Sequence, residues 1–279
     1  MSDDPQQPDA GPPEPPALEE PPGPLTVLLR GMREVVLLAV PIIISMASMT
    51  AMMFVDKLMV AKHAEWRNLG NAPFAAVDQA WILLAVLMAV PHGVLALIST
   101  LASQSIGAGR SREASHYAWQ GVWFSLLVGL LACVLWPIAG HWFAVTGHPV
   151  DVQPYERIYF NWRLLGIPAG CACVSVSSFM QGAHRPVWSM ACALVANAFN
   201  ILANYVLIFG AWGMPEMGIQ GAAVATSLAD WVQASLLLAV LLGPMHKDYG
   251  ARHTWRFNGR RLADLLKIGL PNGGQLLAV

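Results

Sequence analysis

The sequence carries very little charge. Only 12% of its 279 residues are Asp, Glu, Lys or Arg, while 56% are hydrophobic, and the mean hydropathy is +0.50. An average soluble domain has about 25% charged residues, which it needs to cover its surface. The scarcity of charge therefore excludes an ordinary water-soluble domain. The formal net charge of -1 also offers no basic surface for a nucleic-acid partner.

Motifs of enzymes and metal sites are scarce as well. The eight histidines are dispersed and form no HExxH pair. The four cysteines lie in apolar runs without metal-ligand spacing, as expected of small buried thiols. The glycine-rich run at 105–110 follows no strand, so we interpret it as a tight turn and not as a phosphate-binding loop. Because no nucleophile–base pair lies inside the apolar runs, we expect neither an enzyme nor a cofactor.

The N-terminus lacks the basic residues of a signal peptide. Residues 1–24 contain several acids and many prolines but no Lys or Arg. Such a composition cannot bury enough apolar surface to fold by itself. We predict a disordered, acidic and Pro-rich cytoplasmic tail over residues 1–29.

Long uncharged runs dominate the rest of the chain. Each is long enough for a helix to cross a bilayer core of about 30 Å, and none alternates as the strands of a membrane barrel do. We therefore predict an all-α transmembrane fold with six complete spans and the start of a seventh near residue 263. The six spans are 34–58, 78–107, 115–139, 158–180, 187–210 and 219–243.

The distribution of basic residues predicts the orientation. If the N-terminus is cytoplasmic, eleven of the 16 Lys and Arg residues fall on the inner side and five on the outer side. Cytoplasmic segments are enriched in Lys and Arg, so this orientation is favoured. We expect a multi-pass protein of the inner (plasma) membrane, with the basic segment 244–262 in the cytoplasm.

A short internal similarity between two segments of the sequence indicates a repeated architecture. Pro41 follows LLAV early in the first span, and Pro271 follows KIGL early in the seventh. Repeated halves are common in secondary transporters. We therefore expect residues 30–243 to form a six-helix N-terminal lobe, 244–262 an inter-lobe loop and 263–279 the start of a second lobe, which continues in a longer parent protein.

Several polar side chains lie inside the predicted spans. Asp230 is about 12 residues into the sixth span, or ~18 Å deep. The spacing of Asn200 and Asn204 puts them on one face of the fifth span. We predict one oxygen-rich layer that binds a hard cation such as Na⁺, or a proton. Its residues are Asp56, Asn200, Asn204, Thr226 and Asp230.

Two structural interpretations stay open beside this one. Asn and Thr in membrane helices often serve only as hydrogen-bond links between helices. Asp56 ends the first span and is followed by Lys57, so it can be an interfacial residue paired with that lysine.

Several segments in order resemble the multidrug and toxic compound extrusion (MATE) family of secondary antiporters. They cover the chain from about residue 33 to 243, and the most specific is NILANYVLIFG, which is followed by GMPEMGIQGAAVAT. The matching ranges are 41–44, 54–60, 104–110, 200–210 and 213–226.

The resemblance implies twelve helices in two six-helix lobes. It also implies export of bulky, often cationic compounds in exchange for Na⁺ or H⁺. In such a protein Asp56 takes part in cation or proton handling, and Asn200 and Thr226 match family positions in the same lobe. The position of Asn204 is commonly Asp in this family.

That departure leads to a hypothesis about Asp230. Asp230 lies four residues after Thr226, on the same face of the sixth helix. It can supply the carboxylate that Asn204 lacks and form a two-carboxylate site with Asp56. The alternative is that Asp230 faces away and bonds to a neighbouring span.

Two other functions are open. A related flippase for lipid-linked oligosaccharides would need a strongly cationic cavity, for which Arg163 is the one candidate. A membrane protein without transport activity is the second. The expected partners are a small-molecule substrate, the lipid bilayer and the C-terminal lobe of the same protein.

Overall fold

The computed structural model describes residues 24–145 and 147–277, which form helices and turns without a strand. This confirms the expected all-α fold. The elements are α1 (Pro24–Trp66), α2 (Ala72–Ala96), α3 (Ile98–Gly107), α4 (Ser111–Cys133), α5 (Ala139–Val145), α6 (Gln153–Leu164), α7 (Ile167–Gly182), α8 (Pro186–Phe209), η1 (Ala211–Gly213), α9 (Ile219–Leu242), α10 (His246–Tyr249), η2 (Ala251–His253) and α11 (Gly259–Leu277).

The chain divides into a unit that ends at Leu37 and a second unit that begins at Leu38. Most of the predicted N-terminal tail lies outside the described residues. Its last residues, 24–29, are helical, because α1 begins at Pro24. The second unit contains the rest of the structure, and all five predicted site residues belong to it.

Each of the six predicted spans contains a helix or a pair of helices. Four helical stretches are long and apolar enough to cross a membrane: α1 from Val35, α2 together with α3, α8 and α9. The pair α6 and α7, bent by 51°, is a fifth if it counts as one span. The remaining span, predicted as 115–139, corresponds to α4, which ends earlier, at Cys133, and does not belong to these long apolar helices. The first half of α4 carries more polar residues than its second half, among them Arg112, Glu113 and Gln120.

The bend between α6 and α7 falls at Leu165 and Gly166, just before Pro168. Proline lacks an N–H and fixes its own φ, so it starts a helix more readily than it continues one. Pro41, by contrast, lies inside the continuous helix α1.

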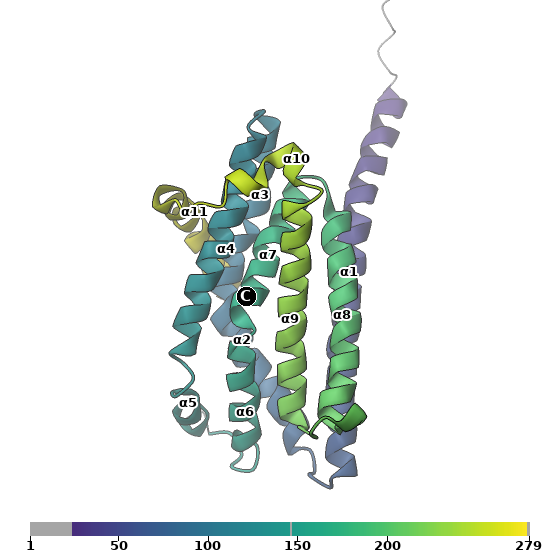
Figure 1. Cartoon of the computed structure of the whole chain (residues 1–279), viewed down its shortest axis with the longest axis vertical. Coiled ribbons are helices and arrows are strands. Elements are labelled where there is room, and N and C mark those ends of the chain that lie inside the picture. Colours follow the sequence, from purple (N-terminus) through teal and green to yellow (C-terminus); the bar gives the residue numbers. More distant parts are fainter. Residues whose placement is uncertain (1–23, 146, 278–279) are drawn as a thin grey trace, which may run out of the picture. The chain divides into compact units, whose positions relative to one another are not determined.

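Helix α7 lies at the centre of the second unit. It packs against α4, α9, α3 and α2, and Phe179 and Met180 are fully buried within the apolar core. Figure 1 shows α9 running beside α7 and α8. The Ser175 hydroxyl of α7 donates to the Ala118 carbonyl of α4 at 2.8 Å, which satisfies a buried polar group between helices.

Polar bridges join α1 to α8 and to the turn after it. The Asn197 amide donates to Ser48 Oγ at 2.8 Å, and the Asn204 amide donates to Asp56. Farther along α1, His63 contacts Glu216. The bridges on α8 are seven residues apart, about two helical turns, so they lie on one face.

Candidate functional site

Four of the predicted site residues form one connected chain of hydrogen bonds. The Asn204 amide donates to Asp56 Oδ1 and, at 2.9 Å, to Asn200 Oδ1. The Asn200 amide donates to Thr226 Oγ1 at 3.3 Å. Both asparagine residues are fully buried. The structure therefore brings α1, α8 and α9 together at the residues Asp56, Asn200, Asn204 and Thr226.

The local sequence explains this convergence. Asn200 and Asn204 are one turn apart and face the same side of α8. Gly221 lets α9 approach α8 closely, because a Cβ at this position would lie 2.6 Å from the Leu207 carbonyl oxygen. The close crossing places Thr226, further along α9, against Asn200.

One oxygen in this cluster has no hydrogen-bond partner among the described residues. Asn204 Oδ1 is buried and receives no donor, although the amide nitrogen of the same side chain makes two hydrogen bonds. Buried polar atoms are nearly always satisfied, so an orphaned acceptor beside a carboxylate is the kind of position at which a cation fits.

Asp230 is not part of this hydrogen-bonded chain. Its Oδ2 accepts a hydrogen bond from Arg163 Nη1 at 2.8 Å, and the same guanidinium nitrogen lies 3.2 Å from Ser227 Oγ. The two-carboxylate hypothesis needs correction here. Asp230 bonds to a neighbouring helix, because a half-buried carboxylate is stabilised far more by a direct cation than by a second acid.

Lys57 does not pair with its neighbour Asp56. It forms an ion pair with Asp78 of α2. Asp56 points instead to Asn204 of α8. Successive residues on a helix face different directions. Lys57 therefore contacts α2, while Asp56 contacts α8.

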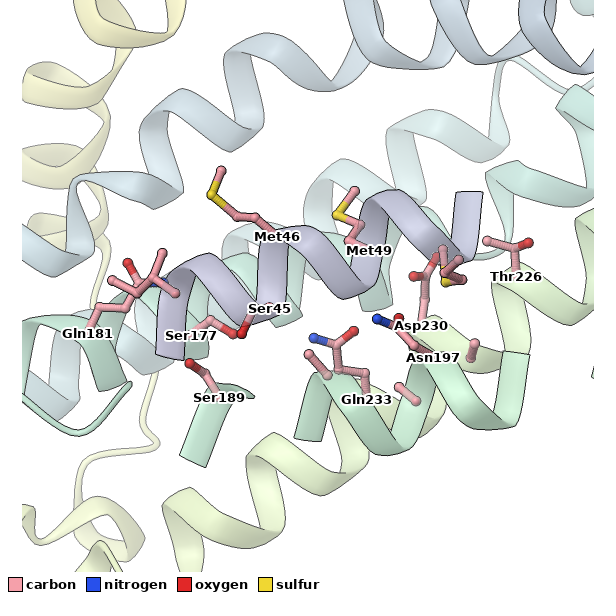
Figure 2. Close-up of a pocket in the computed structure, with 15 residues that line it drawn as sticks. Ser45, Met46, Met49, Ser177, Gln181, Ser189, Asn197, Thr226, Asp230 and Gln233 are labelled. Carbon is pink, nitrogen blue, oxygen red and sulfur yellow. The ribbon is translucent and has the colours of Figure 1, made fainter. Parts of the chain in front are cut away.

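A pocket of about 380 Å³ opens beside the cluster (Figure 2). Residues from α1, α7, α8 and α9 converge on it, and Thr226 belongs both to the pocket and to the hydrogen-bonded chain. Its polar lining residues are Ser45, Ser177, Gln181, Ser189, Asn197, Thr226, Asp230 and Gln233, and α1 adds Met46, Met49 and Met52.

Sequence reasoning missed the role of Arg163. Its partner is 67 residues away along the chain, so no local pattern connects the two. The available signal was the position of a cation next to an apolar run, because a charge inside a membrane segment requires a partner.

An ionic cluster fastens the end of α1 to the turn between α8 and α9. Glu216 accepts hydrogen bonds from Arg67 and contacts His63 at 2.8 Å. These hydrogen bonds, first from Arg67 and then from His63, lower the pKa of Glu216 from 4.5 to about 2. Glu216 is therefore charged at physiological pH.

Comparisons with known proteins agree on one family. The family model MatE matches residues 41–206. Relatives include a probable multidrug resistance protein NorM from Chromobacterium violaceum, 28% identical over 88% of this chain and 52% of its own length. Multidrug resistance protein MdtK from Klebsiella pneumoniae is 29% identical over 86% and 52%, respectively. The chain thus spans about half the length of these curated relatives.

Solved structures share the fold. A eukaryotic MATE transporter, AtDTX14, superposes with a TM-score of 0.77 at 17% identity, over 90% of this chain and 54% of its own. An outward-facing multidrug resistance MATE family transporter of the MOP superfamily gives a TM-score of 0.74 at 22% identity, over 88% and 52%. The expected arrangement of six helices as one lobe agrees with these structures.

Proposed function

Since this chain belongs to the MatE family of multidrug and toxic compound extrusion transporters, we propose that it acts in a secondary antiporter. The antiporter exports organic compounds, often cationic ones, in exchange for Na⁺ or H⁺. The observation that carries this proposal is the buried chain from Asp56 to Thr226, which ends in the wall of the pocket.

The cation or proton would bind at the Asp56 end of this chain. Its carboxylate supplies a negative charge, and Asn204 Oδ1 supplies an acceptor that no described residue uses. Carboxylate and amide oxygens suit a hard cation, while a proton would sit on the carboxylate itself. Asp230 is a weaker candidate for this role, because Arg163 compensates its charge.

Coupling would pass through Thr226. Thr226 lines the pocket, and its hydroxyl accepts the hydrogen bond from Asn200. Asn204 links Asn200 to Asp56 on α1, and α1 also carries three methionines of the pocket wall. A ligand in the pocket and a cation at Asp56 therefore act on the same set of contacts, and each would change the affinity of the other.

We further propose that the protein lies in the inner (plasma) membrane with its N-terminus in the cytoplasm, and that it moves its substrate without converting it chemically. A second lobe of the same protein would complete the transport path. A flippase for lipid-linked sugars is disfavoured, because Arg163 is paired with Asp230 and leaves the pocket without free positive charge among its described lining residues.

Efflux from cells tests the proposal. The gene that encodes this chain is expressed in a bacterium without its own multidrug pumps, and the export of preloaded ethidium is followed by fluorescence. Asp56→Asn should abolish export, because it removes the charge at the cation site. Asp78→Asn is the matched control: it makes the same chemical change at an acid that pairs with Lys57 outside the cluster.

Proteoliposomes then distinguish the coupling ions. A pH gradient and a Na⁺ gradient are imposed separately, and the one that drives export identifies the ion. Export by Asp56→Asn at the wild-type rate under either gradient contradicts the proposed site.

A further inference from the structure

The ion pair of Arg163 and Asp230 lies at the edge of the pocket, and only one of the two residues lines it. Asp230 belongs to the pocket wall, and Arg163 does not. Their side chains are 20% and 24% exposed, in the order Arg163 and Asp230, so both are largely removed from water. The pocket therefore contains a carboxylate whose charge is neutralised by a guanidinium that does not line the pocket.

The surroundings of this pair are built to hold it. A Cβ on Gly166, at the bend between α6 and α7, would lie 2.8 Å from Arg163 Nη1 and 3.0 Å from Asp230 Oδ2. A Cβ here would displace the side chains of the ion pair, and glycine leaves them in contact. The bend also leaves backbone carbonyls without a partner inside the helix, and side chains of α9 bind two of them. Ser227 Oγ donates to the Trp162 carbonyl and Trp231 Nε1 donates to the Leu165 carbonyl, each at 3.0 Å.

These contacts fix the position of Asp230 relative to Arg163. Ser227 and Trp231 flank Asp230 on α9, and each is bonded to a residue within two positions of Arg163 in the chain. The pair is thus a rigid part of the lobe, in contrast to a surface ion pair, in which long side chains lose the bond by rotation.

The remaining wall of the pocket carries no formal charge. Among its described lining residues, Asp230 alone is ionisable, and the others supply amides, hydroxyls, thioethers and methyl groups. Asp56 is bonded to Asn204 and does not line the pocket. A volume of about 380 Å³ suits a compound of drug size, and thioethers make favourable contacts with aromatic rings.

We propose that Arg163 determines the charge selectivity of this pocket: by neutralising Asp230 it weakens the preference for cations, so that the pocket also accepts uncharged aromatic compounds with hydrogen-bonding groups. The inference rests on the proposed function only in taking the pocket as the substrate site. Without Arg163, the unmasked carboxylate attracts cations. Without Asp230, the unmasked guanidinium attracts anions.

Three probes with one ring system test this directly. They are acridine, which is uncharged at mildly alkaline pH, 10-methylacridinium, a permanent cation, and acridine-9-carboxylate, an anion. Their binding to the purified chain in lipid nanodiscs is measured by fluorescence. Equilibrium binding requires no transport, so a failure of the antiport proposal does not affect the result.

Wild type should bind acridine and 10-methylacridinium with similar affinity. Arg163→Gln should raise the affinity for 10-methylacridinium relative to acridine by roughly tenfold to a hundredfold, the range expected for a unit charge several Å away in a partly buried site. Asp230→Asn should shift the preference toward acridine-9-carboxylate. The double variant carries neither charge of the pair, so the net charge is that of wild type, and it should return to the wild-type ranking.

Arg185→Gln is the matched control, because it makes the same substitution at an exposed ion pair with Asp248 that lies outside the pocket. It should keep the wild-type ranking. Arg163→Gln and Asp230→Asn shift the ranking in opposite directions, so either one alone suffices if the other does not fold. Unchanged ranking in both, shifts of the same sign, or no binding of any probe by wild type overturns the inference.

Discussion

Replacing Gln120 with methionine should release the segment 249–258 from α4. Gln120 is fully buried, and both ends of its amide are used. Its Nε2 donates to the Arg256 carbonyl at 3.1 Å, and its Oε1 accepts from the Asn258 N–H at 2.9 Å. Methionine has a similar volume but makes neither bond, so the change isolates the hydrogen bonds from the packing.

The loss of stability follows from the two backbone groups that lose their partner, the Arg256 carbonyl and the Asn258 N–H. An unsatisfied buried polar group costs about 1–3 kcal/mol, and water can reach the exposed residues Arg256 and Asn258 in part. A net loss of about 2–4 kcal/mol remains, which raises the population of the detached segment by roughly 30-fold to 1,000-fold.

Other bonds from α4 to this segment limit the effect to local opening. Three more side chains of the helix contact it: Ser115 Oγ donates to the Tyr249 carbonyl at 2.9 Å, Trp119 Nε1 to Ala251 at 2.9 Å and Trp123 Nε1 to Trp255 at 2.8 Å. The polar first half of α4 therefore serves this segment, which explains why the helix is less apolar than its neighbours.

Limited trypsin digestion of the purified protein measures the opening. Arg252 and Arg256 are exposed side chains within the segment, and cleavage there requires local detachment of the backbone. The rate should rise in Gln120→Met by roughly 30-fold to 1,000-fold, in step with the detached population. Ser125→Ala is the control: it removes a buried hydroxyl of the same helix that bonds only to Gly121 within α4. A cleavage rate in Gln120→Met equal to that of Ser125→Ala refutes the reasoning.

Three further outcomes are expected. Glu216→Gln should lower the melting temperature, and its difference from wild type should shrink in acid, because the contribution of Glu216 is present above its ordinary pKa of 4.5 and is lost as the pH falls through about 2. A melting curve at each pH checks this. Gly182→Ala should destabilise the protein by about 1–3 kcal/mol, since its Cβ would meet the Ser99 carbonyl oxygen at 2.3 Å. Gly107→Ala, which meets nothing within 4 Å, should not; denaturant titration distinguishes them. In a Cys-less protein, an impermeant thiol reagent outside the cell should label three single cysteines and spare the fourth, and labelling of the fourth alone contradicts the proposed orientation. The first three replace Glu65, His148 and Pro215, and the fourth replaces Trp255.

The sequence alone determined the class of the protein and much of the site. Uncharged runs can be read without knowledge of neighbours, because crossing a bilayer depends on length and hydropathy. The same holds for the face shared by Asn200 and Asn204, which helical periodicity sets. The family motifs then pointed to Asp56 and Thr226, and the structure places all four in contact.

Only the tertiary structure decided which groups pair across the chain. Periodicity gives the face of a helix but not its neighbour or the rotation of that neighbour. Asp230 shares a face with Thr226, yet its partner is Arg163, brought there by the bend at Gly166 and the docking of α9 on that bend. The partners of the polar half of α4 were likewise decided by the tertiary structure, because they lie more than a hundred residues away in the segment 249–258. In both cases the decisive energy comes from pairing buried polar groups, and pairing depends on geometry that no local stretch of sequence contains.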